Sequence, residues 1–277
     1  MNKAAAIQMA SGPNVQANLH EADRLIAQAV EAGAELVVLP ENFAFMGMKE
    51  SDKLGVCEQE GSGPLQEFLS DQARRHGIWL VGGTIPLCST SSNKVYAACL
   101  LFDDHGKLVA RYDKIHLFDV ELVESAESYN ESATTEHGKD IIVVDTPFGR
   151  LGLAVCYDLR FPELFRGMLD QGVEIVALPS AFTAITGRAH WESLIRARAI
   201  ENLTFLIAAA QGGYHVNGRE THGDSMIVDP WGNVLDRLPR GSGVVLADID
   251  CERLKSTRRT FPTIQHRRLT CRITSTT

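Results

Sequence analysis

The sequence predicts an α/β protein with mixed sheets, and two observations carry this prediction. In the first ninety residues, short apolar runs alternate with segments of helical periodicity, which is the pattern of β-α units. Later in the chain, paired apolar runs flank short polar turns, which is typical of antiparallel hairpins. β-α units joined to hairpins indicate sheets that contain both parallel and antiparallel strands.

The β-α units come first. Leu19, Leu25 and Ile26 share one face of the first predicted helix. Asn14 is a favourable N-cap for this helix, and Gly33 ends it. The predicted elements, in order, are a strand over 4–9, this helix, a strand over 35–39, a helix over 65–76 and a strand over 79–85.

Three hairpins follow, with one long loop among them. The paired runs are 95–102 with 107–112, 141–145 with 151–155, and 225–229 with 234–238. Residues 119–139 are acidic and polar without periodicity, so we expect a loop of about twenty residues, a length that is often functional. No linker or repeat interrupts the pattern, which favours a single domain over residues 1–277.

Composition limits the classes of function. With 277 residues, of which 44% are hydrophobic and 22% charged, the chain has the balance of a soluble globular protein. Its formal net charge of −8 argues against nucleic acid or an anionic membrane as the main partner. No window approaches roughly 18 consecutive apolar residues, and the first residues lack the apolar core of a signal peptide. We therefore expect a cytoplasmic protein without a membrane span.

The six cysteines are scattered without a CxxC pair, and no HExxH motif is present. We therefore expect no zinc site, no other metal site and no disulfide framework. Five cysteines stand in no recognisable motif and are interpreted as packing residues: Cys57, Cys88, Cys99, Cys251 and Cys271.

Cys156 is the candidate nucleophile. It follows the buried strand pattern of residues 151–155 and precedes a segment that turns directly into a helix. Amide groups at a helix N-terminus favour a thiolate and can bind an oxyanion. The competing interpretation is an inert buried thiol.

Glu41 and Lys114 are candidate partners of that thiol. Glu41 follows an apolar strand among aromatic residues, and apolar surroundings raise a carboxyl pKa towards the range of a general base. Lys114 ends the first hairpin, where it either projects beyond the strand ends or is a solvated surface charge. A Cys–His pair is another common way to activate a thiol. Five histidines stay open for that role: His116, His190, His215, His222 and His266.

Three ordered segments resemble one family. They are Leu-Pro-Glu-Asn at 39–42, Lys-Ile-His-Leu-Phe-Asp at 114–119, and Val-Cys-Tyr-Asp-Leu-Arg-Phe-Pro-Glu at 155–163. They are similar to the Glu, Lys and Cys motifs of the nitrilase superfamily, the carbon-nitrogen hydrolases, and further matching segments extend the resemblance over nearly the whole chain.

The resemblance implies a four-layer αββα sandwich that assembles as a homodimer or higher homo-oligomer. It implies Cys156 as nucleophile, Glu41 as general base and Lys114 as the group that stabilises the tetrahedral intermediate, with no metal or organic cofactor. Many members carry a second glutamate after the lysine, and Glu131 is similar in position. Other glutamates crowd the same loop and leave this choice open: Glu121, Glu124, Glu127 and Glu136.

The segment after Cys156 resembles the branch of amidases that act on amides of 2-oxo acids. Within that branch, the similarity implies cleavage of deaminated glutathione, a small-molecule amide, into 2-oxoglutarate and cysteinylglycine. Arg160 and Thr186 match positions that contact the 2-oxo acid, and an N–H near Tyr157 would bind the oxyanion. The competing interpretations are an ion pair of Arg160 with Glu163 or Asp158, and a backbone hydrogen bond of the Thr186 hydroxyl.

Three other functions remain open on the sequence. An ω-amidase acting on 2-oxoglutaramate would use the same catalytic residues and release ammonia. An N-carbamoyl amine hydrolase would release carbon dioxide with ammonia. A non-catalytic binding module of the same fold is disfavoured because Glu41, Lys114 and Cys156 are all present.

Overall fold

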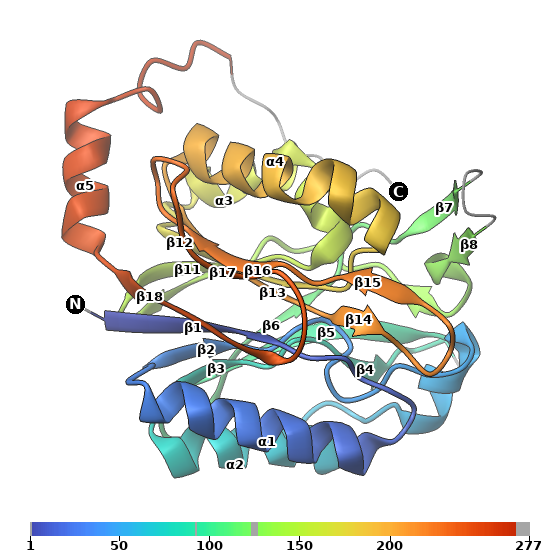
Figure 1. The fold of residues 1–277 in the computed structure, drawn as a ribbon. Helices are drawn as coiled ribbons and strands as arrows, with labels where there is room; N and C mark the ends of the chain where they lie inside the picture. The colour runs from blue at the N-terminus through green and yellow to red at the C-terminus, as the bar shows by residue number, and fades with distance from the viewer. Residues whose placement is uncertain (1, 92, 123–126, 270–277) are drawn as a thin grey trace.

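Two β-sheets face each other at the centre of the molecule, and helices cover their outer faces (Figure 1). The computed structural model describes residues 2–91, 93–122 and 127–269. The order of layers, α, β, β and α, is the sandwich that the resemblance implies, and the predicted α/β class with mixed sheets is confirmed.

The first sheet has parallel strands at its centre, flanked by antiparallel pairs and by one short strand that is parallel to its neighbour. Its strands are β1 (Asn2–Gln8), β2 (Leu36–Val38), β3 (Trp79–Val81), β4 (Ile85–Cys88), β5 (Val95–Phe102), β6 (Leu108–Asp113), β9 (Thr135–Glu136) and β18 (Gly243–Ile249). The order is β18-β1-β2-β3-β5-β4, and β6 and β9 also pair with β5. β1, β2 and β3 are parallel, as β-α units require, and the predicted hairpin of β5 with β6 is confirmed.

The second sheet repeats this plan. Its strands are β10 (Val143–Thr146), β11 (Gly149–Leu153), β12 (Ile175–Ser180), β13 (Phe205–Ala210), β16 (Ser225–Val228) and β17 (Val234–Leu238), in that order across the sheet. β11, β12 and β13 are parallel, and the predicted hairpins β10–β11 and β16–β17 flank them. A small two-stranded sheet, β14 (Gly212–Tyr214) with β15 (Glu220–His222), extends beyond β13.

The helices begin and end where local chemistry favours it. α1 (Val15–Glu31) and α2 (Pro64–His76) cover the first sheet, whereas α3 (Pro162–Asp170) and α4 (Ala184–Asn202) cover the second, and α5 (Cys251–Thr260) follows β18 (Figure 1). The Asn14 side chain caps α1 by accepting from the Ala17 N–H, as predicted. Gly77 ends α2 in the left-handed conformation, with φ 60°.

Strand β1 shows how the layers are held together. Ala4 and Ala6 belong to the core that the two sheets share, whereas Ala5 and Ile7 belong to the core beneath α1 and α2. Alternate residues of a strand point to opposite faces, so a run that is apolar at every position, as residues 4–7 are, fits only between two apolar layers. This explains why the run lacks the alternation of an exposed strand.

The expectation of a structureless loop over 119–139 was wrong. This stretch contains β7 (Asp119–Leu122), β8 (Glu127–Asn130), the short helix η2 (Glu131–Ala133) and β9. β7 and β8 pair only with each other, and no residue of either strand is buried. Because neither face is buried, the apolar alternation that reveals most strands is missing.

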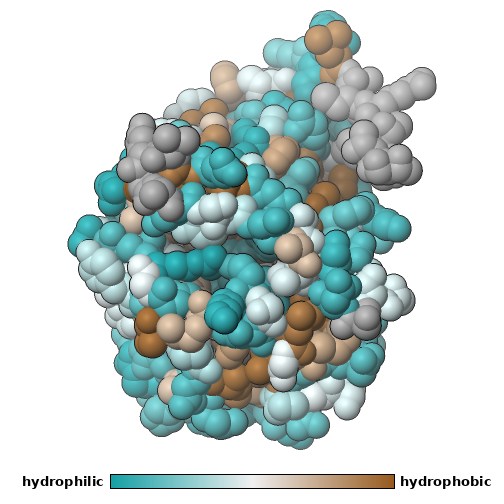
Figure 2. Space-filling view, turned by 90° about the vertical axis from the view of Figure 1, so that its right-hand side faces the viewer, coloured by the Kyte–Doolittle hydropathy of each residue, from teal (hydrophilic) through white to brown (hydrophobic). Residues whose placement is uncertain are grey.

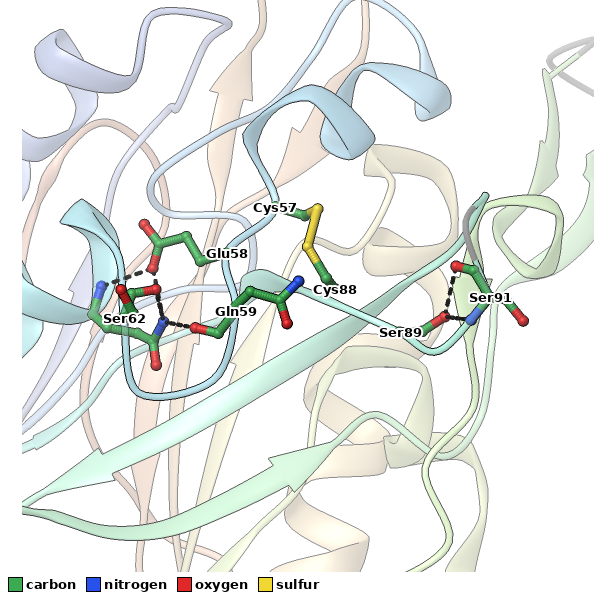
Figure 3. The surroundings of a disulfide bond; sticks show 8 residues. Cys57, Glu58, Gln59, Ser62, Cys88, Ser89 and Ser91 are labelled. Atoms are coloured by element: carbon green, nitrogen blue, oxygen red, sulfur yellow. Dashed lines mark hydrogen bonds between the residues drawn. A yellow bond between two sulfur atoms is a disulfide. The ribbon is translucent and has the colours of Figure 1, made fainter.

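The expectation that no disulfide forms was also wrong. Cys57 follows the short helix η1 (Glu50–Val56), Cys88 ends β4, and the two are joined by a disulfide (Figure 3). The pairing arises because residue 58 forms a bridge with Leu87, which brings the two chain segments side by side. Cys99 and Cys251 are free, as is Cys156, and Cys271 lies outside the described residues.

In the described ranges, none of the helices is both long and apolar enough to cross a membrane. Within the same ranges, no group of three or more His, Cys, Asp and Glu side chains is placed to hold a metal ion.

Candidate active site

A pocket of about 700 Å³, open mouth included, brings together all the site residues predicted from the sequence. They are Glu41, Lys114, Glu131, Cys156, Tyr157, Arg160 and Thr186. β8 and β15, which contribute to its lining, lie on the right-hand side of Figure 1, and Figure 2 shows that side as a largely hydrophilic surface.

The chain turns sharply at Cys156. Three residues after β11 ends, the short helix η3 (Cys156–Arg160) begins, and Cys156 has φ 48°, a value that non-glycine residues rarely adopt. A carboxylate two residues later holds the turn, because Asp158 accepts the Val155 N–H at 2.8 Å. The thiol is thereby presented at the strand end, in a conformation maintained by the surrounding contacts.

Asp158 connects this turn to the first sheet. It is fully buried and accepts the Tyr112 hydroxyl at 2.7 Å, and it also binds the His116 N–H at 3.1 Å and the His116 ring Nδ1 at 2.7 Å. Buried carboxylates are stable only when their oxygens are hydrogen-bonded, and both Asp158 oxygens are. The Lys motif and the Cys motif are therefore joined through one side chain.

Contacts to the backbone of Pro40 and Glu41 fix the position of Glu41. Gln211 donates to the Glu41 carbonyl at 3.0 Å, and Gly83 packs so closely that a Cβ there would lie 2.1 Å from the Pro40 carbonyl oxygen. Gly83 also has φ 57°, so the position requires glycine for both space and conformation. This requirement also explains why the predicted strand over 79–85 stops at Val81.

Lys114 lies between two carboxylates. Its Nζ is 2.8 Å from Glu41 Oε1 and 2.8 Å from Glu131 Oε2, and the Lys114 side chain is almost completely buried. Glu131 also accepts the Phe118 N–H at 2.7 Å. Among the described glutamates of residues 119–139, Glu131 is the one that lines the pocket, and Glu124 lies outside the described residues.

The pKa values of the thiol and the ammonium reflect this arrangement. Burial raises the pKa of Cys156 well above its ordinary value, the negative charge of Glu41 raises it further, and Lys114 opposes both. Burial alone would lower the pKa of Lys114, but Glu131 and Glu41 raise it well above the ordinary value. Both directions favour a protonated thiol beside a charged lysine in the free site.

Cys156 has no histidine partner in the part of the chain that the structure describes. Its Sγ accepts the Ala181 N–H at 3.5 Å, and no histidine lines the pocket. His116 instead bonds to Asp158 and stacks on Phe161 with ring centroids 3.7 Å apart. The geometry therefore does not support the Cys–His pair that the sequence left open.

Arg160 and Thr186 both line the pocket. The Arg160 guanidinium is 5.1 Å from the Phe182 ring centroid, and its Nη1 is 3.2 Å from His190 Nδ1. Among the described residues, neither Glu163 nor Asp158 pairs with it. The Thr186 hydroxyl is 2.8 Å from that of Thr183 and reaches the Thr183 carbonyl at 3.5 Å, which is the backbone contact of the competing interpretation.

Sequence reasoning missed four charged residues that also line this pocket: Glu50, Lys53, Arg219 and Glu220. Lys53 and Arg219 both pair with Glu50, and Arg219 lies over the Tyr129 ring at 4.7 Å. Glu50 and Arg219 are 169 positions apart in the chain, so no local pattern could have joined them.

Comparisons with known proteins agree with this geometry. Residues 3–259 match the carbon-nitrogen hydrolase family. A deaminated glutathione amidase from Yersinia enterocolitica is 43% identical, over 95% of this chain and 92% of that protein. The structure of Saccharomyces cerevisiae Nit3, a member of branch 10 of the nitrilase superfamily, matches with a TM-score of 0.86 at 31% identity, over 97% of both chains.

A variant of the amidase from Nesterenkonia sp. AN1, solved after acrylamide added to its active-site cysteine, matches with a TM-score of 0.79 at 28% identity, over 96% of this chain and 100% of that chain. The family match spans most of the chain and agrees with both the fold and the ordered motifs. The resemblance predicted from the sequence is therefore confirmed, and this chain belongs to the carbon-nitrogen hydrolase family.

Proposed function

We propose that this protein is a thiol amidohydrolase that cleaves deaminated glutathione into 2-oxoglutarate and cysteinylglycine. The observation that carries the proposal is Lys114, buried between Glu41 and Glu131 in the pocket that Cys156 lines. Such a site supplies a nucleophile, a base and a fixed positive charge, the three elements of acyl transfer. The substrate is suggested by relatives named deaminated glutathione amidase, which are 38–45% identical.

In the first half of the proposed reaction, the Cys156 sulfur attacks the amide carbon while its proton passes to Glu41. Transfer during attack fits a thiol whose raised pKa keeps it protonated in the free site. Lys114 and the Tyr157 N–H stabilise the oxyanion of the tetrahedral intermediate. Glu41 then protonates the leaving amine, the C–N bond breaks, and a thioester to Cys156 remains.

In the second half, water attacks the thioester and gives its proton to Glu41. The second tetrahedral intermediate collapses, the C–S bond breaks, and the sulfur recovers a proton from Glu41 as the carboxylic acid leaves. Glu131 is the residue that holds Lys114 in place through both halves, since it contacts the ammonium with both oxygens. No step uses a metal or an organic cofactor.

Arg160 and Thr186 are the proposed binding residues for the 2-oxo acid. A guanidinium presents a planar pair of donors that matches a carboxylate, and Arg160 is held over two aromatic rings, those of Tyr157 and Phe182. The Thr186 hydroxyl is buried beside that of Thr183, where it can donate to a carbonyl or carboxylate oxygen.

The experiment that tests this proposal is a coupled assay of 2-oxoglutarate release. Deaminated glutathione and 2-oxoglutaramate are compared side by side, with C156A as the blank. A much larger kcat/KM for deaminated glutathione is expected. Preference for 2-oxoglutaramate would identify an ω-amidase instead, and activity on neither substrate would contradict the proposed substrate class and direct the search to N-carbamoyl amines.

Assembly as a homodimer or higher homo-oligomer is also part of the proposal. Three apolar side chains at the ends of α4 and α5 and in the turn before β17 are exposed and close together: Ile200, Trp231 and Phe261. Such a cluster on the surface is typical of a contact between copies. Light scattering after size exclusion checks it, and a monomer at micromolar concentration would contradict it.

The proposed location is cytoplasmic. The support is the sequence pattern, whereas the Cys57–Cys88 disulfide does not favour it, because reducing compartments keep thiols reduced. Alkylation of the protein in intact cells, followed by mass spectrometry, measures whether this pair is oxidised there. An oxidised pair would contradict the cytoplasmic location.

A further inference from the structure

Cationic groups lie at both ends of a row of three aromatic rings in the pocket lining. Arg160 lies over the first ring, and Arg219, which lies over the last, forms with Lys53 what we call the distal pair. The distal pair is held by Glu50, whose carboxylate is 2.8 Å from the Lys53 Nζ and binds the Arg219 guanidinium through its other oxygen. Two cations thus share one anion, so these three side chains together carry a formal charge of +1, and Glu220 is a further charged residue of the lining.

The three rings of this row contact one another in order. Tyr157, beneath Arg160, contacts Phe118 with ring centroids 5.0 Å apart, and Phe118 contacts Tyr129 at the same separation. Arg219 lies over Tyr129 at 4.7 Å. The row therefore runs along the pocket from one guanidinium to the other, and an elongated ligand can lie along it.

The catalytic groups lie along this row, between its ends. Glu131 accepts the N–H of Phe118, the central ring, and contacts Lys114. Tyr129, under the distal pair, is two residues from Glu131, and two residues of extended chain span at most about 7 Å. A dipeptide leaving group has the same reach. The length of such a leaving group is thus comparable to the stretch of chain between Glu131, which contacts Lys114, and Tyr129, which lies under Arg219.

The charges at the distal end suit an anion. Burial would raise the pKa of Glu50, but Lys53 and Arg219 lower it to about 2, so Glu50 is ionised at any working pH. The Lys53 and Arg219 side chains remain 21% and 32% exposed, so each can turn donors towards a ligand. Guanidinium groups bind carboxylates through paired hydrogen bonds.

We propose that Lys53 and Arg219 bind the terminal carboxylate of the leaving group and so select amides with an anionic amine portion. The inference rests on the proposed function and deepens it. Arg160 would hold the 2-oxo acid, the distal pair would hold the glycine carboxylate of cysteinylglycine, and the scissile amide would be stretched between them over Cys156.

The test compares three substrates on the wild type and on the variants R219Q and K53M. The substrates are deaminated glutathione, the same compound with its glycine carboxylate amidated, and 2-oxoglutaramate, whose leaving group is ammonia. For the free acid, we expect each variant to lower kcat/KM by about 10- to 100-fold, mainly through KM, since a charged hydrogen bond contributes roughly 1.5–3 kcal/mol. For the other two substrates the change should stay within about threefold.

Two controls keep the test specific. R74Q removes an arginine from the exposed face of α2 and should leave all three substrates unaffected. R219K keeps the charge and should recover part of the loss, which a merely structural role of the guanidinium would not predict. Thermal unfolding curves establish that each variant is folded.

The outcomes separate the two proposals. If the wild type does not cleave deaminated glutathione, the proposed substrate is wrong, and this assignment is overturned with it. If the wild type cleaves it, but R219Q and K53M lower all three substrates equally or none of them, the assignment alone is overturned.

Discussion

Cys156 and Cys99 are both buried thiols, but Cys156 lines the pocket and Cys99 does not. Cys99 lies within β5 of the first sheet, and Cys156 lies at the end of a strand of the second. Burial is the main cause that raises the pKa of each above its ordinary value. Burial alone therefore does not distinguish a nucleophile from a packing residue.

The difference lies in the groups that surround each sulfur. Two aspartates, Asp113 and Asp158, further raise the pKa of Cys99 and oppose its ionisation. The negative charge of Glu41 likewise raises the pKa of Cys156, but Lys114 and a backbone N–H donor from Ala181 lower it. A positive charge and a donor fixed beside the sulfur therefore distinguish the nucleophile from the packing residue, because both stabilise the negative charge that develops in the reaction.

The largest expected effect is on the thiol itself. C156A should lower kcat by at least about 1000-fold, because no other group in the pocket can form the thioester. C99A is the matched control and should keep kcat within about twofold, since its sulfur touches no reacting group. Steady-state assays on both variants check this. Comparable losses in the two would contradict the distinction between them.

The next largest expected effect follows from removing the positive charge of Lys114. K114M should lower kcat by about 100- to 1000-fold, the usual effect of losing an oxyanion partner. It should also slow alkylation of Cys156 by iodoacetamide, because the pKa of the thiol rises further without the lysine. Peptide mass spectrometry gives the labelling rate at each cysteine.

The control for that variant is K107M, at the exposed turn of the same hairpin, which should behave as wild type. Methionine at 114 leaves two buried carboxylates without a cation, so the folded fraction is measured first. Unchanged labelling of Cys156 in folded K114M would contradict the role given to the lysine.

Much of this site was predictable because its key residues lie within short motifs. Glu41 and Cys156 each follow a strand pattern, and the carboxyl ends of the parallel strands in the two sheets bring them into one pocket. The hairpins and the helix caps follow from periodicity and turn residues. Local patterns therefore predicted the strands, the helices and the candidate residues, whereas the order of layers and the roles of those residues followed from the family resemblance.

The missed features depend on pairing between distant segments. Arg219 and Glu50 meet only after the two sheets pack, and Cys57 meets Cys88 only because residue 58 bridges to β4. β7 and β8 were missed because an exposed hairpin shows no apolar alternation. In each case the information lies in tertiary contact, and a single sequence gives no periodicity or motif from which to infer it.

Asp158 acts on both thiols: its charge raises the pKa of Cys99, and its side chain holds the turn at Cys156. D158N replaces an acceptor of four hydrogen bonds with a group that has a single acceptor oxygen. We expect the free energy of unfolding to fall by about 2 kcal/mol, with a roughly tenfold lower kcat because the turn at Cys156 loosens. Denaturant unfolding and steady-state assays measure the two effects.

Y112F removes only one of those hydrogen bonds and should lower the free energy of unfolding by about 1 kcal/mol with little change in kcat. If D158N were as stable as the wild type, the carboxylate would not hold the turn. If Y112F lowered kcat as much as D158N, the effect on activity would come from the tyrosine contact.

The smallest expected effect is on Cys99. C99A leaves a small cavity in β5 and should lower the free energy of unfolding by about 1 kcal/mol at pH 7. Above pH 9 the sign of the pH effect matters: the pKa of Cys99 is raised in the folded state, so the unfolded chain loses the proton first and wild-type stability falls as pH rises. This slope reaches at most about 1.4 kcal/mol per pH unit for one thiol.

C99A lacks that titration, so the difference between wild type and variant should shrink between pH 9 and pH 10. Urea unfolding of wild type and C99A at pH 7, 9 and 10 measures the difference. A constant difference across this range would mean that Cys99 ionises as readily in the folded protein as in the unfolded chain. That result would contradict the electrostatic difference inferred between Cys156, which has Lys114 beside it, and Cys99.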